Sequence, residues 1–121
     1  MKRAFVQSSN VTRILRDENV TDDGLRQVEV AIMNGAGVTV SGTGGLKKIR
    51  CGSVGKGKSG SVRILFADYP RLGRVYMLAA FAKREQANVS ASERNVLKKI
   101  KQALDERVDK LCEVADEDQE S

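Results

Sequence analysis

Residues 52–68 read GSVGKGKSGSVRILFAD, and this stretch decides between two fold classes. Its first part, 52–59, matches the pattern G-x-x-x-x-G-K-[ST], in which backbone amides and a lysine bind nucleotide phosphates. The apolar run that follows ends in Asp68, and nucleotide hydrolases hold their metal ion with an aspartate of this kind. The stretch could therefore belong to a parallel, nucleotide-binding sheet, or it could connect two antiparallel strands.

A phosphate-binding loop needs a helix directly after it, because the amides at the helix N-terminus bind the phosphates. Residues 60–66 instead alternate with a period of two, which is typical of a strand, and Pro70 follows too soon for a helix. A parallel neighbour would also need a crossover of about a dozen residues or more, whereas Asp68 lies only ten residues after Lys58. The stretch therefore predicts a basic loop between antiparallel strands and no nucleotide site.

The segments around this loop predict the rest of the sheet and the first helices. Short connections between three strand-like segments favour an antiparallel meander. These segments are residues 46–51, 61–68 and 74–82. Upstream of them we expect a short strand at residues 3–7, a helix around residues 11–15 and a second helix between Thr21, a good N-cap, and Gly35.

The C-terminal third predicts one long helix. Ser90 and Glu93 form a capping box. Apolar residues then recur at helical spacing and form one stripe: Leu97, Ile100, Leu104, Val108 and Leu111. We expect this stripe to pack on the sheet, with docking of a partner as the alternative. Residues 113–121 are acidic and predict a disordered tail after a domain at residues 1–112.

The predicted fold class is therefore α+β, with an antiparallel sheet of three to four strands, two N-terminal helices and a long C-terminal helix. A length of 121 residues predicts one domain. No apolar run approaches the roughly 20 residues of a membrane helix, and no secretory leader is evident, so we expect a cytoplasmic protein and no membrane partner. Cys51 and Cys112 are far apart in sequence, which fits a reducing compartment.

Several kinds of catalysis are disfavoured by composition. The chain has no histidine, so it lacks the usual general base near neutral pH and the commonest zinc ligand. We expect no metal site and no cofactor. Any acid–base chemistry must use Lys, Arg, Tyr, Asp or Glu.

The positive charge is concentrated in the middle of the chain. The net charge is +5, but residues 46–84 contain ten Lys and Arg against one acid, whereas residues 109–121 contain six acids against one Lys. A basic segment of this density indicates a polyanionic partner.

Strand alternation predicts that these cations share one face of the sheet. The apolar face would carry Ile49, Cys51, Val62, Ile64, Phe66, Val75, Met77, Ala79 and Phe81. The opposite face would carry Lys48, Arg50, Arg63, Arg74, Tyr76 and Arg84, with Lys56 and Lys58 on the loop at one end. Such a cationic face with one aromatic ring suits single-stranded RNA, whose phosphates meet the cations while a base stacks on the ring.

Such a face could also cleave RNA, which carries its own nucleophile, the 2′-OH. A lysine crowded by other cations has a lowered pKa and can act as a base, while arginine donates hydrogen bonds to the charge that develops on phosphorus. This chemistry requires neither histidine nor metal in principle. A non-catalytic RNA-binding protein would show the same face, so both functions remain open on the residues alone.

Four segments carry a resemblance to a known family. They are GTGGLKKIR (42–50), GKGKSGSVRILF (55–66), VYMLAAFAKREQ (75–86) and the helix start SASER (90–94). Together they resemble RelE/HigB-type toxins of bacterial toxin–antitoxin modules, and the likeness extends over roughly residues 3–108. The resemblance implies a metal-independent, ribosome-dependent endoribonuclease that cleaves mRNA and inhibits translation.

The resemblance also implies roles for particular residues. The catalytic arginine falls on Arg63, the basic pair of the preceding strand on Lys48 and Arg50, and the cation after the last strand on Lys83 or Arg84. Some relatives have a C-terminal tyrosine that stacks on the cleaved base, but Ser90 stands in that region here. Phe66 likewise occupies a position where tyrosine is common, so Tyr76 is the candidate for base stacking.

The partners implied by the resemblance are mRNA, the ribosome and a neutralising helix-turn-helix antitoxin, with operator DNA bound only through the antitoxin complex. Toxins of the ParE type share this fold but act on gyrase. The Lys and Arg residues of the predicted sheet favour the ribonuclease over that alternative.

Overall fold

The computed structural model describes residues 2–52, 62–82 and 88–120, with side chains of the last helix described through Val114. The elements, in chain order, are β1 (Ala4–Gln7), α1 (Ser9–Asp17), α2 (Asp22–Met33), β2 (Val38–Thr39), β3 (Lys47–Cys51), β4 (Val62–Tyr69), β5 (Arg74–Ala82) and α3 (Ala91–Glu120). This order confirms the predicted α+β class, with two helices before the meander and one long helix after it.

The described strands form one sheet in the order β1-β5-β4-β3-β2. β3, β4 and β5 are the predicted antiparallel meander. The sheet is larger than the predicted three to four strands, because β1 pairs in parallel with β5 and the two-residue β2 pairs with β3. A strand of two residues has no period that a sequence could reveal, which explains why β2 was missed.

The loop that matches the nucleotide-binding pattern joins two antiparallel neighbours. β3 ends at Cys51, β4 begins at Val62, and these two residues are paired in the sheet. A phosphate-binding loop would require a parallel neighbour reached through a helix. The strands on either side therefore confirm the predicted antiparallel connection, whereas residues 53–61 themselves lie outside the described part.

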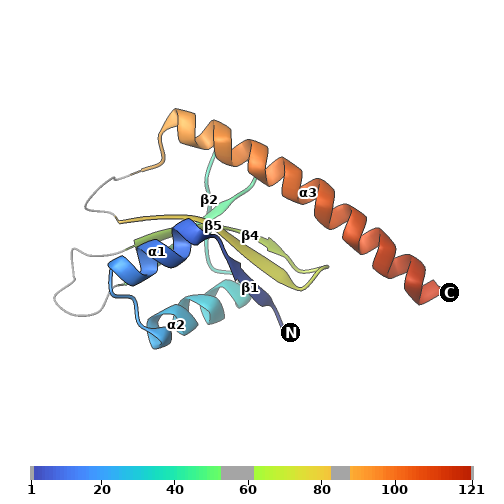
Figure 1. The fold of residues 1–121 in the computed structure, drawn as a ribbon, viewed down its shortest axis with the longest axis horizontal. Coiled ribbons are helices and arrows are strands. Elements are labelled where there is room, and N and C mark those ends of the chain that lie inside the picture. The colour runs from blue at the N-terminus through green and yellow to red at the C-terminus, as the bar shows by residue number, and fades with distance from the viewer. Residues whose placement is uncertain (1, 53–61, 83–87, 121) are drawn as a thin grey trace.

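Helices cover both faces of the sheet, with α1 and α2 on one side and α3 across the other (Figure 1). The first apolar core joins α1 and α2 to one face of the strands, and it includes Val11, Val28, Ile64, Phe66 and Met77. The second core lies on the opposite face and includes Leu65, Ala67, Phe81, Val89 and Leu97. The face predicted to be open and cationic is therefore partly apolar and covered.

A β-bulge explains part of this difference. Leu65 pairs with Ala79 whereas Phe66 pairs with Met77, so Leu78 is an extra residue in β5. An extra residue reverses the alternation of every side chain beyond it. The prediction that Ala79 and Phe81 share a face with Met77 is therefore wrong, since both pack in the second core.

The predicted helix starts are confirmed by their caps. The Thr21 hydroxyl accepts a hydrogen bond from the Gly24 amide at 3.1 Å. Ser90 and Glu93 make both bonds of the capping box, with the Ser90 amide donating to the Glu93 carboxylate at 3.0 Å and the Glu93 amide donating to the Ser90 hydroxyl at 3.2 Å. Such a cap stabilises a helix by about 1 kcal/mol.

The stripe of α3 packs on its own sheet, as expected, with Leu97 and Val108 buried and Ile100 more exposed. The helix continues through residues 113–120, where the sequence predicted a disordered tail. Its C-terminal end extends past the sheet (Figure 1). In the described part of the chain, no helix has the length and apolar character needed to cross a membrane. Both cysteines are free and buried.

Candidate functional site

Two arginines face each other across the centre of the meander. Arg50 of β3 pairs directly with Arg63 of β4. Directly opposed side chains lie on the same face of a sheet, with Cβ atoms about 5 Å apart, and like charges in this position are destabilising. Their neighbours Cys51 and Val62 are buried in the first core, so both arginines point to the other side, where α3 lies. Arg50 is exposed and Arg63 is half-buried.

Lys48 extends this positive cluster along β3. It lies two residues before Arg50, on the same face, and it pairs with Val38 on one side and Leu65 on the other. These apolar neighbours can pack against the methylene stem while the ammonium stays in water. Lys48, Arg50 and Arg63 thus form one group, which we call the cationic cluster.

Arg74 and Tyr76 lie at the opposite end of the sheet from the cationic cluster. Tyr76 pairs with Ala67, four residues along β4 from Arg63, which is about 13 Å at roughly 3.3 Å per residue. An Arg74 Nη atom donates a hydrogen bond to the Tyr76 hydroxyl at 3.2 Å. The single face predicted from the sequence is therefore divided, and Tyr76 is not placed beside Arg63.

Tyr69 connects this far end of the sheet to α3. Its ring contacts Tyr76 edge-on, with centroids 5.9 Å apart, and its hydroxyl donates to the Asp105 carboxylate at 2.7 Å. Lys101 Nζ bonds the same carboxylate at 2.6 Å and lies 5.4 Å from the centroid of the Tyr69 ring. Burial and the bond to Asp105 raise the pKa of Tyr69 well above its ordinary value. These contacts hold α3 on the sheet.

Four predicted site residues lie outside the described part of the chain: Lys56, Lys58, Lys83 and Arg84. The described residues that flank their segments include Gly52, Val62 and Ala82. Val62 pairs with both Cys51 and Ala82, one position along the sheet from Arg50 and Arg63. These flanking residues therefore lie at the end of the sheet that carries the two arginines.

The described residues offer cations for chemistry, with few other reactive groups. Over residues 2–52, 62–82 and 88–114, no group of three His, Cys, Asp or Glu side chains could hold a metal ion. Burial raises the pKa of the Cys51 thiol, which disfavours the reactive thiolate. What the cationic cluster can do is bind an anion and stabilise negative charge that develops on it.

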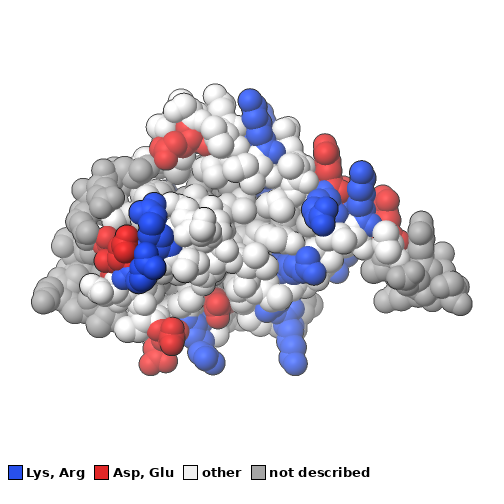
Figure 2. Space-filling view, viewed as in Figure 1, with Lys and Arg blue, Asp and Glu red and all other residues white. Residues whose placement is uncertain are grey.

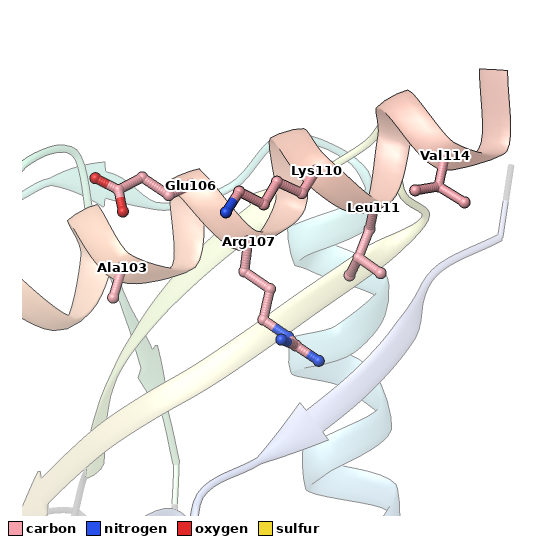
Figure 3. A pocket seen from close by; sticks show the side chains of 6 residues that line it. All are labelled: Ala103, Glu106, Arg107, Lys110, Leu111 and Val114. Carbon is pink, nitrogen blue, oxygen red and sulfur yellow. The ribbon is translucent and has the colours of Figure 1, made fainter. Parts of the chain in front are cut away.

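One hollow of the described surface adjoins the cationic cluster, because its lining includes Leu65 and Phe81, the cross-strand partners of Lys48 and Arg63. Another lies away from the cluster. A groove of about 400 Å³ is lined by α3 residues Ala103, Glu106, Arg107, Lys110, Leu111 and Val114. Figure 3 shows Arg107 and Leu111 pointing from the same side of this helix. Because every described lining residue comes from α3, the groove is the flank of one helix. On the face drawn in Figure 2, the coloured basic and acidic side chains are interspersed.

The sequence analysis missed the contacts of Tyr69, because it ended the strand-like segment at residue 68. One signal was present: Lys101 and Asp105 are spaced i, i+4, the spacing at which opposite charges pair on a helix. Nothing in the sequence, however, indicated that this pair would meet Tyr69.

Comparison with protein families gives one match. A family model described as RelE toxin of RelE / RelB toxin-antitoxin system matches residues 2–119. The match includes the meander, the cationic cluster and nearly all of α3.

Proposed function

This chain belongs to the RelE toxin family of toxin–antitoxin systems, and from that premise we propose that it is a ribosome-dependent endoribonuclease that cleaves mRNA and so inhibits translation. The family supports a toxin whose activity an antitoxin neutralises. That the substrate is mRNA and that the reaction is cleavage on the ribosome goes beyond the family and is what we propose.

The observation that carries the proposal is the direct pairing of Arg50 with Arg63, with Lys48 beside them. Two arginines in opposed positions repel each other and weaken the sheet. A polyanion bound across both strands would turn this repulsion into attraction. An RNA strand meets this need, because it presents one phosphate per nucleotide and arginine can bind a phosphate through two parallel hydrogen bonds.

The proposed reaction uses the nucleophile of the RNA itself. The 2′-oxygen gives its proton to the Lys48 amine and attacks the adjacent phosphorus, while the bond from phosphorus to the 5′-oxygen breaks and that oxygen takes a proton from Lys83 or Arg84. Arg63 donates hydrogen bonds to the non-bridging oxygens, on which negative charge builds up. Lys48 is thus a catalytic residue with Arg63, Arg50 holds the flanking backbone, and Lys83 or Arg84 is the further catalytic cation next to the reacting phosphate.

The test is cleavage of translated mRNA by purified protein and ribosomes. Replacing Arg63 with Ala should lower the cleavage rate roughly 10²–10³-fold, the usual effect of removing one donor to a developing oxyanion. Arg26 on α2 is exposed and lies outside the cationic cluster, so Arg26→Ala is the matched control and should keep the wild-type rate. Tight RNA binding without cleavage by the wild-type chain would instead identify a non-catalytic RNA-binding protein.

The partners follow from the same proposal. An acidic segment of a helix-turn-helix antitoxin would lie over the cationic cluster and exclude RNA from it, and operator DNA would be bound only by that complex. The substrate would place the chain in the cytoplasm, where translation occurs. Co-purification from cells that express the neighbouring reading frame checks the antitoxin, and competition between antitoxin and RNA checks the surface.

A further inference from the structure

A glycine-rich turn, residues 41–45, lies against the first half of α3. A Cβ atom added to Gly42 would lie 3.6 Å from Arg94 Cδ, and one added to Gly44 would lie 3.6 Å from Lys98 Cγ. Gly42, Gly44 and Gly45 have φ values of +79°, +75° and +110°, so the turn depends on glycine. The glycines are exposed, and the turn presents its backbone beside these two cations.

The shape of this turn is fixed from within. Thr43 is fully buried, and its hydroxyl donates to the Val40 carbonyl at 2.7 Å and accepts from the Leu46 amide at 3.2 Å. A turn locked in this way can hold a ligand without first losing conformational freedom.

The cations beside the turn are not all neutralised. Lys101, whose Cγ also lies close to Gly44, donates to Asp105 and is thereby paired. Lys98 is exposed. Among the described residues, Arg94 has the one buried side-chain nitrogen with no hydrogen-bond partner, its Nε. Buried donors of this kind are rare in native proteins, and an unpartnered one calls for an explanation, of which a bound ion is one.

The turn is continuous with the cationic cluster. Lys48 follows Gly45 by three residues, and Arg50 lies two residues further along β3, about 7 Å at roughly 3.3 Å per residue. Lys48 and Arg50 project to the side of the sheet on which α3 lies. A backbone bound at Arg50 and Arg63 can therefore continue past Lys48 toward the turn.

We propose that the turn Gly42–Gly45, together with Arg94 and Lys98, binds a phosphate of the RNA strand at a position outside the cleaved bond. That the ligand is RNA rests on the proposed function. That the site binds a phosphate group rests on the turn and its cations. Arg94 donates hydrogen bonds to the phosphate, Lys98 adds a mobile positive charge, and the absence of Cβ atoms lets the backbone approach closely. Such a contact positions the strand and carries no base preference.

Binding of a short, uncleavable 2′-O-methyl RNA at several salt concentrations tests the proposal. Loss of one phosphate contact on a single strand makes the slope of log K against log[salt] shallower by about 0.7. Lys98→Gln should show this change, and the slope should stay at the wild-type value for Lys99→Gln, which removes the same charge from the next, exposed position of α3. Equal slopes for the two variants would overturn the proposal. Arg94→Lys keeps the charge but lacks Nε, and it should weaken binding with little change of slope.

Amide NMR signals of Gly42, Gly44 and Gly45 give a second readout. The RNA should shift all three signals, whereas inorganic phosphate at the same phosphate concentration should leave them in place. If inorganic phosphate alone shifts the signals to saturation, the turn is a site for free anions and the RNA contact is contradicted. Cleavage separates the two proposals. If wild-type protein does not cleave mRNA but Lys98→Gln still alters the slope, the phosphate contact stands and the proposed reaction fails.

Discussion

Replacing Arg50 with Gln should stabilise the fold and weaken the activity at the same time. The side chain lies directly opposite Arg63, so the variant removes a repulsion between like charges. For charges about 7 Å apart in water, Coulomb's law gives about 0.6 kcal/mol, within the range measured for cross-strand pairs. For 121 residues the entropy of unfolding is about 250 cal/mol/K, so the melting temperature should rise by about 2 °C.

Calorimetry at low and high salt is the assay. The gain should vanish near 1 M salt, where the Debye length falls to about 3 Å. Arg26→Gln is the matched control, because Arg26 is exposed on α2, outside the cationic cluster, and its loss should leave the melting temperature unchanged. RNA affinity should fall in Arg50→Gln and stay at the wild-type value in Arg26→Gln. A lower melting temperature for Arg50→Gln would refute the reasoning that Arg50 repels Arg63.

Three further changes test other parts of the structure. Tyr69→Phe should cost about 1.5 kcal/mol in denaturant unfolding, because the bond to the Asp105 carboxylate is lost. Since the folded pKa of Tyr69 is raised, the wild type should also lose stability as pH rises above about 10, and the variant should lack this contribution. Gly37→Ala should cost at least about 2 kcal/mol, since φ is +122° and the new Cβ would lie 2.8 Å from Phe66 Cζ. Deleting residues 113–121 should leave cleavage and its salt dependence unchanged; faster cleavage at low salt would show that this acidic segment screens the cationic cluster.

The meander was predictable because its signals are local. The observed strand bounds at Cys51, Val62 and Ala82 lie within one residue of the predicted bounds. Turn residues and a period of two in the sequence mark these positions. The side chains of β5 were harder to assign. VYMLAAFA is apolar at nearly every position, so its period cannot show that Leu78 is an extra residue, and the bulge reverses the faces beyond it.

The division of the predicted RNA face has a different cause. Its cations were placed correctly relative to one another on β3 and β4, because pairing of adjacent antiparallel strands follows from a short connection. The position of α3 depends on contacts between residues far apart in sequence, such as Tyr69 with Asp105, and no local pattern specifies them. The sequence therefore predicted Arg50 and Arg63 together but could not predict that α3 would pack on part of the same face.

Mapping the 5′ ends of cellular mRNA after the chain is expressed without its antitoxin tests the central claim most directly. We predict growth arrest and new 5′ ends inside translated reading frames, which disappear when translation initiation is blocked and in the Arg63→Ala variant. Growth arrest with no new ends would contradict the account, and DNA breaks in place of RNA ends would indicate a toxin directed at gyrase.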